Sequence, residues 1–294
     1  MEPSTARVRH HPRQAVPFAL LAVAAWSTVA TGFELGLRVL EPVQLLFLGA
    51  AASAGLFAAL ATVGRQWRPQ RAAWKSGLAL GLLNPFLYYL VLLEAYDRLP
   101  AQIAQPLNYT WAITLALLAV PILGQPLTRP VLLGLLTSYA GVVVLLSGGR
   151  FDSAPDLDWV GVALALGSTV IWAVYWLANA RSTLPSVTLM AWSFLTAVPL
   201  LALACWLGPG LPPLRSDTAL YGAWVGLVEM GFAYLCWQRA MRLTDNAGRI
   251  GQLIFLSPFL SLVLIGSVLG ETIRSSSVVG LAIIVLGLWL SQRG

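Results

Sequence analysis

A single carboxyl group in the middle of a long apolar run has the clearest chemical potential in this sequence. Glu229 lies near the centre of the run at 219–238, three residues after Gly226. A carboxyl group at the centre of a membrane-spanning helix costs roughly 2.5–3.5 kcal/mol on insertion scales, so it normally faces a cavity or a partner. We expect Glu229 to bind a substrate amine or to carry a proton. The structural alternative is a helix-packing carboxyl held by a hydrogen bond.

Amide side chains in other apolar runs could meet such a carboxyl group. Asn84 precedes Pro85, which frees a backbone carbonyl one turn earlier. In the run at 101–120, Gln102, Gln105, Asn108 and Tyr109 are spaced three to four residues apart or adjacent, largely on one helical face. Gln252 begins a later run. These side chains could line a water-filled path or join helices by hydrogen bonds, and the sequence favours neither.

Aromatic residues also recur at helical spacing. Trp172, Tyr175 and Trp176 follow an i, i+3, i+4 pattern that stacks them on one face of a helix, and Trp26 and Tyr88 lie in other apolar runs. An aromatic-walled cavity suits substrates with apolar or aromatic side chains. Contact with lipid or with neighbouring helices is the alternative for the same residues.

These residues must be positioned by membrane-spanning helices. The chain has 294 residues, 58% of them hydrophobic and only 10% charged, against about 25% charged in soluble domains. Each apolar run approaches the ~20 residues that cross the bilayer as a helix, and lipid requires helix because every backbone polar group must be paired. The runs are 16–37, 43–64, 76–96, 101–120, 128–147, 159–179, 187–207, 219–238, 250–270 and 275–292.

Other function classes find little support in the composition. The net charge of +6 is distributed between apolar runs rather than gathered in one patch, so we expect no nucleic-acid partner. His10 and His11 are the only histidines, and Cys205 and Cys236 have no metal-ligand spacing. No nucleotide-binding loop, zinc-protease motif or hydrolase elbow occurs. We expect no enzyme activity, cofactor or metal.

The positive charges predict the orientation. With ten spans and an inner N-terminus, most lysines and arginines fall on the inner side, which by the positive-inside rule is cytoplasmic. The inner set is Arg7, Arg9, Arg13, Arg65, Arg68, Arg71, Lys75, Arg129, Arg181, Arg239, Arg242, Arg249 and Arg293. The outer set is Arg38, Arg98, Arg150, Arg215 and Arg274. Both termini are therefore predicted to be cytoplasmic.

The two halves of the chain resemble each other. An offset of 146 residues places Trp26 on Trp172 and superposes five pairs of glycines, and an offset of 145 places Asn84 on Glu229. Because each half has an odd number of spans, the second half enters the membrane from the opposite side. We predict an all-α membrane protein of two inverted five-helix repeats around a central cavity, an architecture that recurs in transporters.

The pattern resembles the drug/metabolite transporter superfamily, EamA type. The resemblance rests on Trp26 and Trp172, on Ser257–Pro258, and on Val268–Glu271 followed by Gly280 and Gly287. The first half has Gln125 where the pattern favours Glu. Within the superfamily the chain looks most similar to bacterial aromatic amino-acid exporters of the YddG type. The resemblance implies ten helices around a central cavity and export of aromatic and other neutral amino acids.

Together these features predict a bacterial inner-membrane exporter of small organic metabolites that works by alternating access. Its partners would be a small-molecule substrate and the lipid bilayer, and a monomer is plausible. Two readings stay open: proton-coupled export of drugs or cationic compounds through Glu34 or Glu229, and a membrane-embedded enzyme acting on lipid. The predicted units are a cytoplasmic tail (1–15), a first repeat (16–149), a linker (150–158) and a second repeat (159–294). The predicted substrate-binding residues are Trp26, Asn84, Tyr88, Asn108, Trp172, Tyr175, Trp176, Glu229 and Gln252.

Overall fold

Helices make up all of the regular structure in the part of the chain that can be described. The computed structural model describes residues 12–67, 71–123, 129–146, 148, 157–180, 185–243, 252–291 and 293. Within these ranges the backbone forms α, 3-10 and π helices and no strand. The all-α class predicted from the sequence is confirmed.

The helices of the first half follow the predicted apolar runs, but three of those runs are broken within their length. Its elements are α1 (Pro12–Ser27), α2 (Val29–Leu37), α3 (Pro42–Val63), α4 (Arg71–Gly81), η1 (Leu82–Leu87), α5 (Tyr88–Arg98), α6 (Ala101–Tyr109), α7 (Trp111–Leu123) and α8 (Arg129–Leu146). Asn84 has extended dihedrals (φ −150°, ψ 120°) inside η1, where Pro85 has no N–H to donate to the preceding turn.

The second half has the same order of long and broken helices, except that its first helix is continuous. Its elements are α9 (Trp159–Ala180), α10 (Ser186–Leu207), α11 (Ser216–Ala223), η2 (Trp224–Phe232), α12 (Ala233–Leu243), η3 (Gln252–Phe255), α14 (Leu256–Leu264), η4 (Ile265–Leu269) and α15 (Ser275–Ser291). The π-helix η2 holds Glu229, as η1 holds Asn84. The backbone is therefore irregular at both intramembrane polar positions, a feature often found at functional sites.

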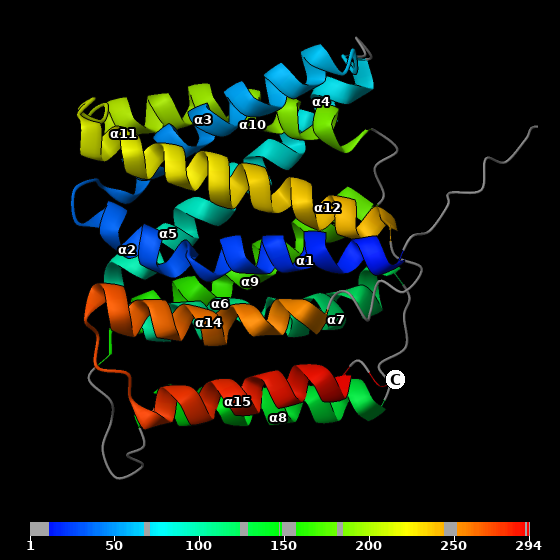
Figure 1. Cartoon of the computed structure of the whole chain (residues 1–294), viewed down its shortest axis with the longest axis vertical. Helices are drawn as coiled ribbons and strands as arrows, with labels where there is room; N and C mark the ends of the chain where they lie inside the picture. The colour runs from blue at the N-terminus through cyan, green and yellow to red at the C-terminus, as the bar shows by residue number, and fades with distance from the viewer. Residues whose placement is uncertain are drawn as a thin grey trace, which may run out of the picture.

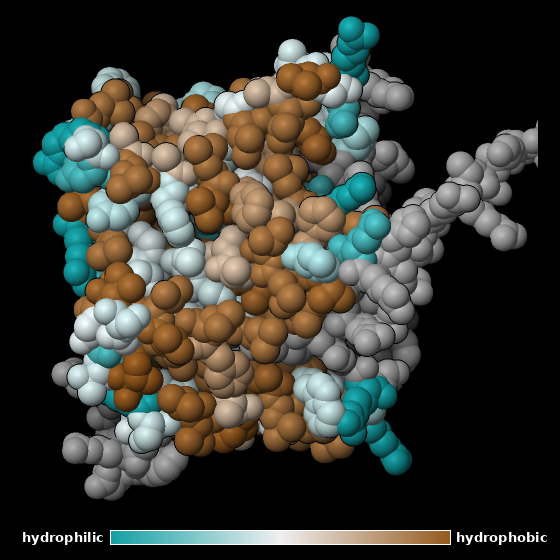
Figure 2. All heavy atoms as spheres, viewed as in Figure 1, coloured by the Kyte–Doolittle hydropathy of each residue, from teal (hydrophilic) through white to brown (hydrophobic). Residues whose placement is uncertain are grey.

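Several helices are long and apolar enough to cross a membrane. In the described residues, five stretches qualify by length and composition: Gln14–Leu37, Pro42–Val63, Trp74–Arg98, Val187–Leu207 and Ser216–Ala240. Shorter apolar helices cover Leu132–Leu146, Trp159–Tyr175, Leu256–Leu269 and Ser275–Leu290. Figure 2 shows hydrophobic residues across the middle of the face in view, with hydrophilic residues gathered at the two ends where the helices finish.

The two halves pack on each other with exchanged partners. α5 packs on α9 while α12 packs on α1, and α4 packs on α10 while η2 packs on α3. Similarly, α7 packs on α9 while α14 packs on α1. Two pairs join corresponding helices, α3 with α10 and α8 with α15, and the latter lies at one edge of the molecule (Figure 1). The start of α1 and the end of α15 lie at the same end of the bundle.

Glycines allow these close contacts. A Cβ on Gly226 would lie 2.3 Å from the carbonyl oxygen of Gly49 in α3, and a Cβ on Gly81 would lie 2.4 Å from the carbonyl oxygen of Ser193 in α10. Each glycine is the second member of a Gly-x-x-x-Gly pair, Gly77/Gly81 or Gly222/Gly226. This spacing lets helix backbones approach closely. Helices α3 and α10 are also joined near both ends, by Gln44 Nε2 donating to the Gly210 carbonyl and Thr188 Oγ1 donating to the Gln66 carbonyl, each at 2.9 Å.

Candidate functional site: a central aromatic cavity with one carboxyl group

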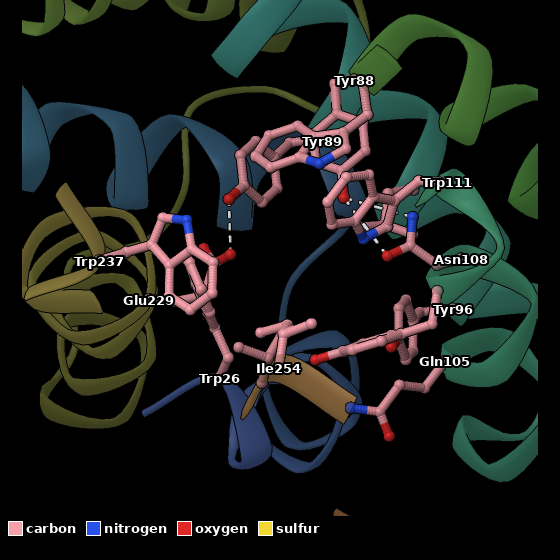
Figure 3. A pocket seen from close by; sticks show the side chains of 14 residues that line it. Trp26, Tyr88, Tyr89, Tyr96, Gln105, Asn108, Trp111, Glu229, Trp237 and Ile254 are labelled. Atoms are coloured by element: carbon pink, nitrogen blue, oxygen red, sulfur yellow. Dashed lines mark hydrogen bonds between the residues drawn. The ribbon is translucent and has the colours of Figure 1, made fainter. Parts of the chain in front are cut away.

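A cavity lies between the two halves of the molecule and contains about 670 Å³ of atom-free space, part of it open to the outside. Both halves contribute side chains to its wall (Figure 3). The described lining residues are Trp26, Val29, Tyr88, Tyr89, Leu92, Tyr96, Gln105, Asn108, Tyr109, Trp111, Trp172, Glu229, Trp237 and Ile254.

Glu229 is the only carboxyl group among those lining residues. Its side chain comes from η2 and is 5% exposed. The Tyr89 hydroxyl, from α5 in the other half, donates a hydrogen bond of 2.5 Å to Glu229 Oε1 (Figure 3). Glu229 Oε2 is buried and has no hydrogen-bond partner among the residues that the structure describes. One oxygen of the carboxyl group is thus held by the protein, and the other is unpaired at the cavity wall.

A second polar contact mirrors the first across the two halves. Asn84 Nδ2, on η1, donates to the Tyr234 hydroxyl, on α12, at 3.3 Å. The offset of 145 residues that relates Asn84 to Glu229 also relates Tyr89 to Tyr234. Each half therefore offers a tyrosine to the polar residue of the other half. Like Glu229, Asn84 keeps one buried oxygen, Oδ1, without a partner in the described part of the chain.

Aromatic rings form a continuous wall around this polar centre. Trp172 stacks on Tyr88 with ring centroids 4.4 Å apart, and it packs in a T-shaped arrangement with Tyr234, with centroids 6.1 Å apart. The ring centroid of Trp26 lies 6.1 Å from that of Tyr234 and 5.4 Å from that of Trp237. Such edge and stacked pairs stabilise packing beyond the area they bury. The wall therefore runs across the boundary between the halves.

Two amides of α6, Gln105 and Asn108, lie on the same cavity, and Asn108 is already hydrogen-bonded to neighbouring side chains. Asn108 Nδ2 donates to Ser168 Oγ at 3.0 Å and to the Tyr88 hydroxyl at 3.2 Å. The Tyr109 hydroxyl donates to Ser257 Oγ at 2.7 Å. Gln105 is 2% exposed and also lines the cavity. Both alternatives left open by the sequence apply here, because the same residues line the cavity and join helices.

The predicted binding residues divide into three groups. Those that line the cavity are Trp26, Tyr88, Asn108, Trp172 and Glu229. Asn84 and Tyr175 do not line the cavity. Asn84 donates a hydrogen bond to Tyr234, and the Tyr175 ring stacks on Trp172 with ring centroids 5.7 Å apart. The side chains of Trp176 and Gln252 lie outside the part of the chain that the structure describes.

Several lining residues were not predicted as binding residues. The repeat offsets could have found some of them, because Trp237 corresponds to Leu92 and Ile254 corresponds to Asn108. Both members of each pair line the cavity. Tyr96 and Trp111 have no such signal, since their side chains face the cavity only because of how the broken helices are rotated.

A second, charged hollow lies beyond the central cavity, and we call it the vestibule. It is lined by Glu34, Tyr96, Asp97, Arg98, Leu99, Pro100, Gln102, Glu271, Thr272 and Arg274. Tyr96 belongs to both linings and is 3% exposed. Glu34 Oε1 lies 4.0 Å from Arg38 Nε. Glu34, in α2, therefore belongs to the vestibule and not to the described lining of the central cavity.

The sequence profile of the EamA-like transporter family matches residues 13–147 and 159–292. The chain belongs to this family. The two matches cover nearly the whole chain, one in each half. This EamA-like chain is a multi-pass membrane protein of the transporter class, and family membership favours transport over catalysis.

Relatives of this EamA-like protein include transporters from archaea and bacteria. An uncharacterized transporter of Archaeoglobus fulgidus is 24% identical over 93% of this chain and 96% of its own. The inner membrane protein YtfF of Escherichia coli is 26% identical over 95% of this chain and 94% of its own. One solved structure, described as the crystal structure of a protein, superposes with a TM-score of 0.68 at 23% identity and covers 95% of this chain and 96% of its own. That likeness supports the fold.

Proposed function

We propose that this EamA-like protein exports small organic metabolites that carry an amine on an aromatic or apolar body, the class that includes aromatic and neutral amino acids. The observation that carries the proposal is the central cavity, which is built from both halves and combines aromatic walls with one carboxyl group. Concave, mostly apolar sites with a few convergent polar groups are typical of small-molecule binding.

The transport mechanism we propose is alternating access of two inverted five-helix repeats. Its support is the exchange of packing partners between the halves, seen in α5–α9 against α12–α1. The two tyrosine contacts, Tyr89 with Glu229 and Tyr234 with Asn84, are exchanged in the same way. If the halves swap conformations, the cavity between them becomes accessible from alternate sides while its residues stay the same.

The proposed setting is a bacterial inner membrane, with both termini cytoplasmic. The start of α1 and the end of α15 lie on one side of the bundle (Figure 1). The positive-inside rule then makes that side cytoplasmic, because it carries the larger set of lysines and arginines. The vestibule lies near Arg98 and Arg274, on the opposite, outer side.

Substrate contacts in this proposal follow the chemistry of the wall. Glu229 Oε2 would accept a hydrogen bond from the substrate amine, since it has no donor in the described part of the chain. Asn84, which does not line the cavity, would support the site through its hydrogen bond to Tyr234. The rings of Trp26, Trp172 and Tyr88 would hold the apolar body. The two predicted residues with undescribed side chains, Trp176 and Gln252, stay candidates for the same site.

Uptake into liposomes that hold the purified protein tests this proposal. Labelled phenylalanine, tryptophan, threonine and lysine would be offered with and without an imposed proton gradient. We expect saturable uptake of phenylalanine and tryptophan, with each competing against the other and no uptake in empty liposomes. Absence of uptake of all four by folded protein would overturn the assignment of amino acids as substrates.

Proton coupling is a second candidate property, and the unpaired Glu229 oxygen favours it. A buried carboxyl group with no cation beside it is costly when charged, so it would bind either a proton or a substrate amine. Glu229→Gln should then abolish the response of uptake to the proton gradient. An unchanged response in that variant would exclude Glu229 as the coupling group.

A further inference from the structure

The charges around the central cavity are unbalanced. Glu229 contributes a carboxyl group, and none of the described lining residues is a lysine, arginine or histidine. Arg98 and Arg274 line the vestibule and not the central cavity. A ligand in the central cavity therefore meets one acidic group and no basic group from the described wall.

Three of the four tyrosine hydroxyl groups that line the cavity donate to protein acceptors. Tyr88 donates to Asn108 Oδ1 at 3.4 Å, Tyr89 to Glu229 Oε1 at 2.5 Å, and Tyr109 to Ser257 Oγ at 2.7 Å. Among the described lining residues, Glu229 also presents a buried acceptor, Oε2, that has no hydrogen-bond partner in the described part of the chain. The centre is thus arranged to receive hydrogen-bond donors.

The aromatic wall suits a positive charge as well as an apolar body. Ring faces attract cations within about 6 Å of their centroids, and the effect grows when the site is desolvated. Trp26, Tyr88 and Trp172 line the same cavity as Glu229. An ammonium group beside Glu229 would find both a carboxylate and aromatic rings.

We infer that the central cavity prefers organic monocations, namely protonated amines on an aromatic or apolar body without a carboxylate, over zwitterionic amino acids with the same body. The inference rests on the proposed function and narrows its substrate class. A zwitterionic amino acid would place its ammonium beside Glu229 but would bury its carboxylate without a counter-charge, and an unpaired buried charge is strongly unfavourable. The corresponding decarboxylated amine has the same body and ammonium but does not incur that cost.

Three ligands with one phenylethyl body test the inference: phenethylamine as cation, phenylalanine as zwitterion and 3-phenylpropanoate as anion. Their binding to the purified full-length protein would be measured by titration calorimetry in lipid nanodiscs. We expect phenethylamine to bind at least about tenfold more tightly than phenylalanine, equivalent to about 1.4 kcal/mol, and 3-phenylpropanoate to show no binding.

Two matched variants separate the carboxyl group in the cavity from the one in the vestibule. Glu229→Gln should weaken phenethylamine binding by at least about tenfold, whereas Glu34→Gln should leave it unchanged, because Glu34 lies outside the described lining. The thermal unfolding transition of each variant would verify that it is folded. Full phenethylamine affinity in folded Glu229→Gln would overturn the inference.

The ligand series also distinguishes this inference from the proposed function. If phenylalanine binds as tightly as phenethylamine or more tightly, selection of monocations is wrong, and the proposed export of amino acids stands. If none of the three ligands binds to folded protein, and the same preparation shows no uptake of labelled phenylalanine, both the inference and the proposed function are wrong.

Discussion

At the scale of single residues, the hydrogen bond between Tyr89 and Glu229 fixes the carboxyl group at the cavity wall. The hydroxyl lies 2.5 Å from Oε1, and both side chains are buried. A hydrogen bond to an ionisable group contributes about 1.5–3 kcal/mol, and leaving a buried polar atom unpaired costs a similar amount. Tyr89 therefore positions the carboxyl group so that its other oxygen stays unpaired.

Tyr89→Phe should lower the free energy of unfolding by about 1–3 kcal/mol, because Glu229 would lose its only hydrogen-bond partner in the described part of the chain. Thermal unfolding of the purified protein in detergent measures the change. Tyr139→Phe is the matched control, since Tyr139 is 51% exposed. Equal transition temperatures for Tyr89→Phe and the unaltered protein would contradict this role of Tyr89.

Sequence patterns predicted part of this residue chemistry. Glu229 and Asn84 were identifiable because polar groups are costly inside lipid, and the structure makes both of them partners of tyrosines from the opposite half. The tyrosine partners could not be assigned in advance, because their contacts depend on how η1 and η2 turn the side chains. Gln102 was grouped with Asn108 by helical spacing, yet it lines the vestibule while Asn108 lines the central cavity.

At the scale of elements, glycines set the distance between helices of opposite halves. The carbonyl oxygen of Gly49 lies where a Cβ on Gly226 would have to fit. Gly226→Ala should therefore separate η2 from α3 and destabilise the fold by about 1–3 kcal/mol, as overpacking typically does. The matched control is Gly167→Ala in α9, where a Cβ would meet nothing within 4 Å. Similar thermal transitions in both variants would contradict the proposed close packing.

A polar clamp holds the start of α6 at the vestibule. Glu271 Oε2 accepts from Gln102 Nε2 at 2.9 Å, and Glu271 Oε1 accepts from the Ala101 N–H at 3.3 Å. Gln102 Oε1 in turn accepts from Ser277 Oγ at 3.0 Å. The clamp thereby ties α6 of the first half to the loop and helix that end the second half.

Glu271→Ala should loosen the start of α6, because the helix would lose an acceptor for one of its terminal N–H groups, a loss worth about 1 kcal/mol. Hydrogen exchange measured by mass spectrometry should show backbone amides at 99–105 exchanging roughly fivefold faster. Glu94→Ala is a control, since Glu94 bonds to the exposed Arg98. Unchanged exchange in Glu271→Ala would contradict the clamp.

The broken helices show where reasoning from sequence patterns reaches its limit. Apolar runs at 76–96 and 101–120 predicted continuous helices, but the first is interrupted at Asn84 and the second at Thr110. Pro85 indicated the first interruption, since proline cannot donate to the preceding turn. Nothing comparable indicated the π-helix η2, which contains no proline.

At the scale of the whole molecule, Tyr96 separates the central cavity from the vestibule. Its ring lines both and packs edge-on against Phe33, with centroids 5.4 Å apart. Tyr96→Ala should connect the two spaces and speed the labelling of a cavity cysteine from the vestibule side. Tyr96→Phe keeps the ring and should not. Equal labelling rates in the two variants would contradict a barrier at Tyr96.

The most direct test of the account follows one cavity position from both sides of the membrane. Val29→Cys, with Cys205 and Cys236 replaced by serine, places a single thiol on the cavity wall. A membrane-impermeant thiol reagent would be added to either face of vesicles, with and without phenethylamine or phenylalanine. Alternating access predicts that this thiol is labelled from both faces and that the ligand that binds reduces the labelling. Labelling from one face only, or labelling that bound ligand does not reduce, would contradict a central site with alternating access.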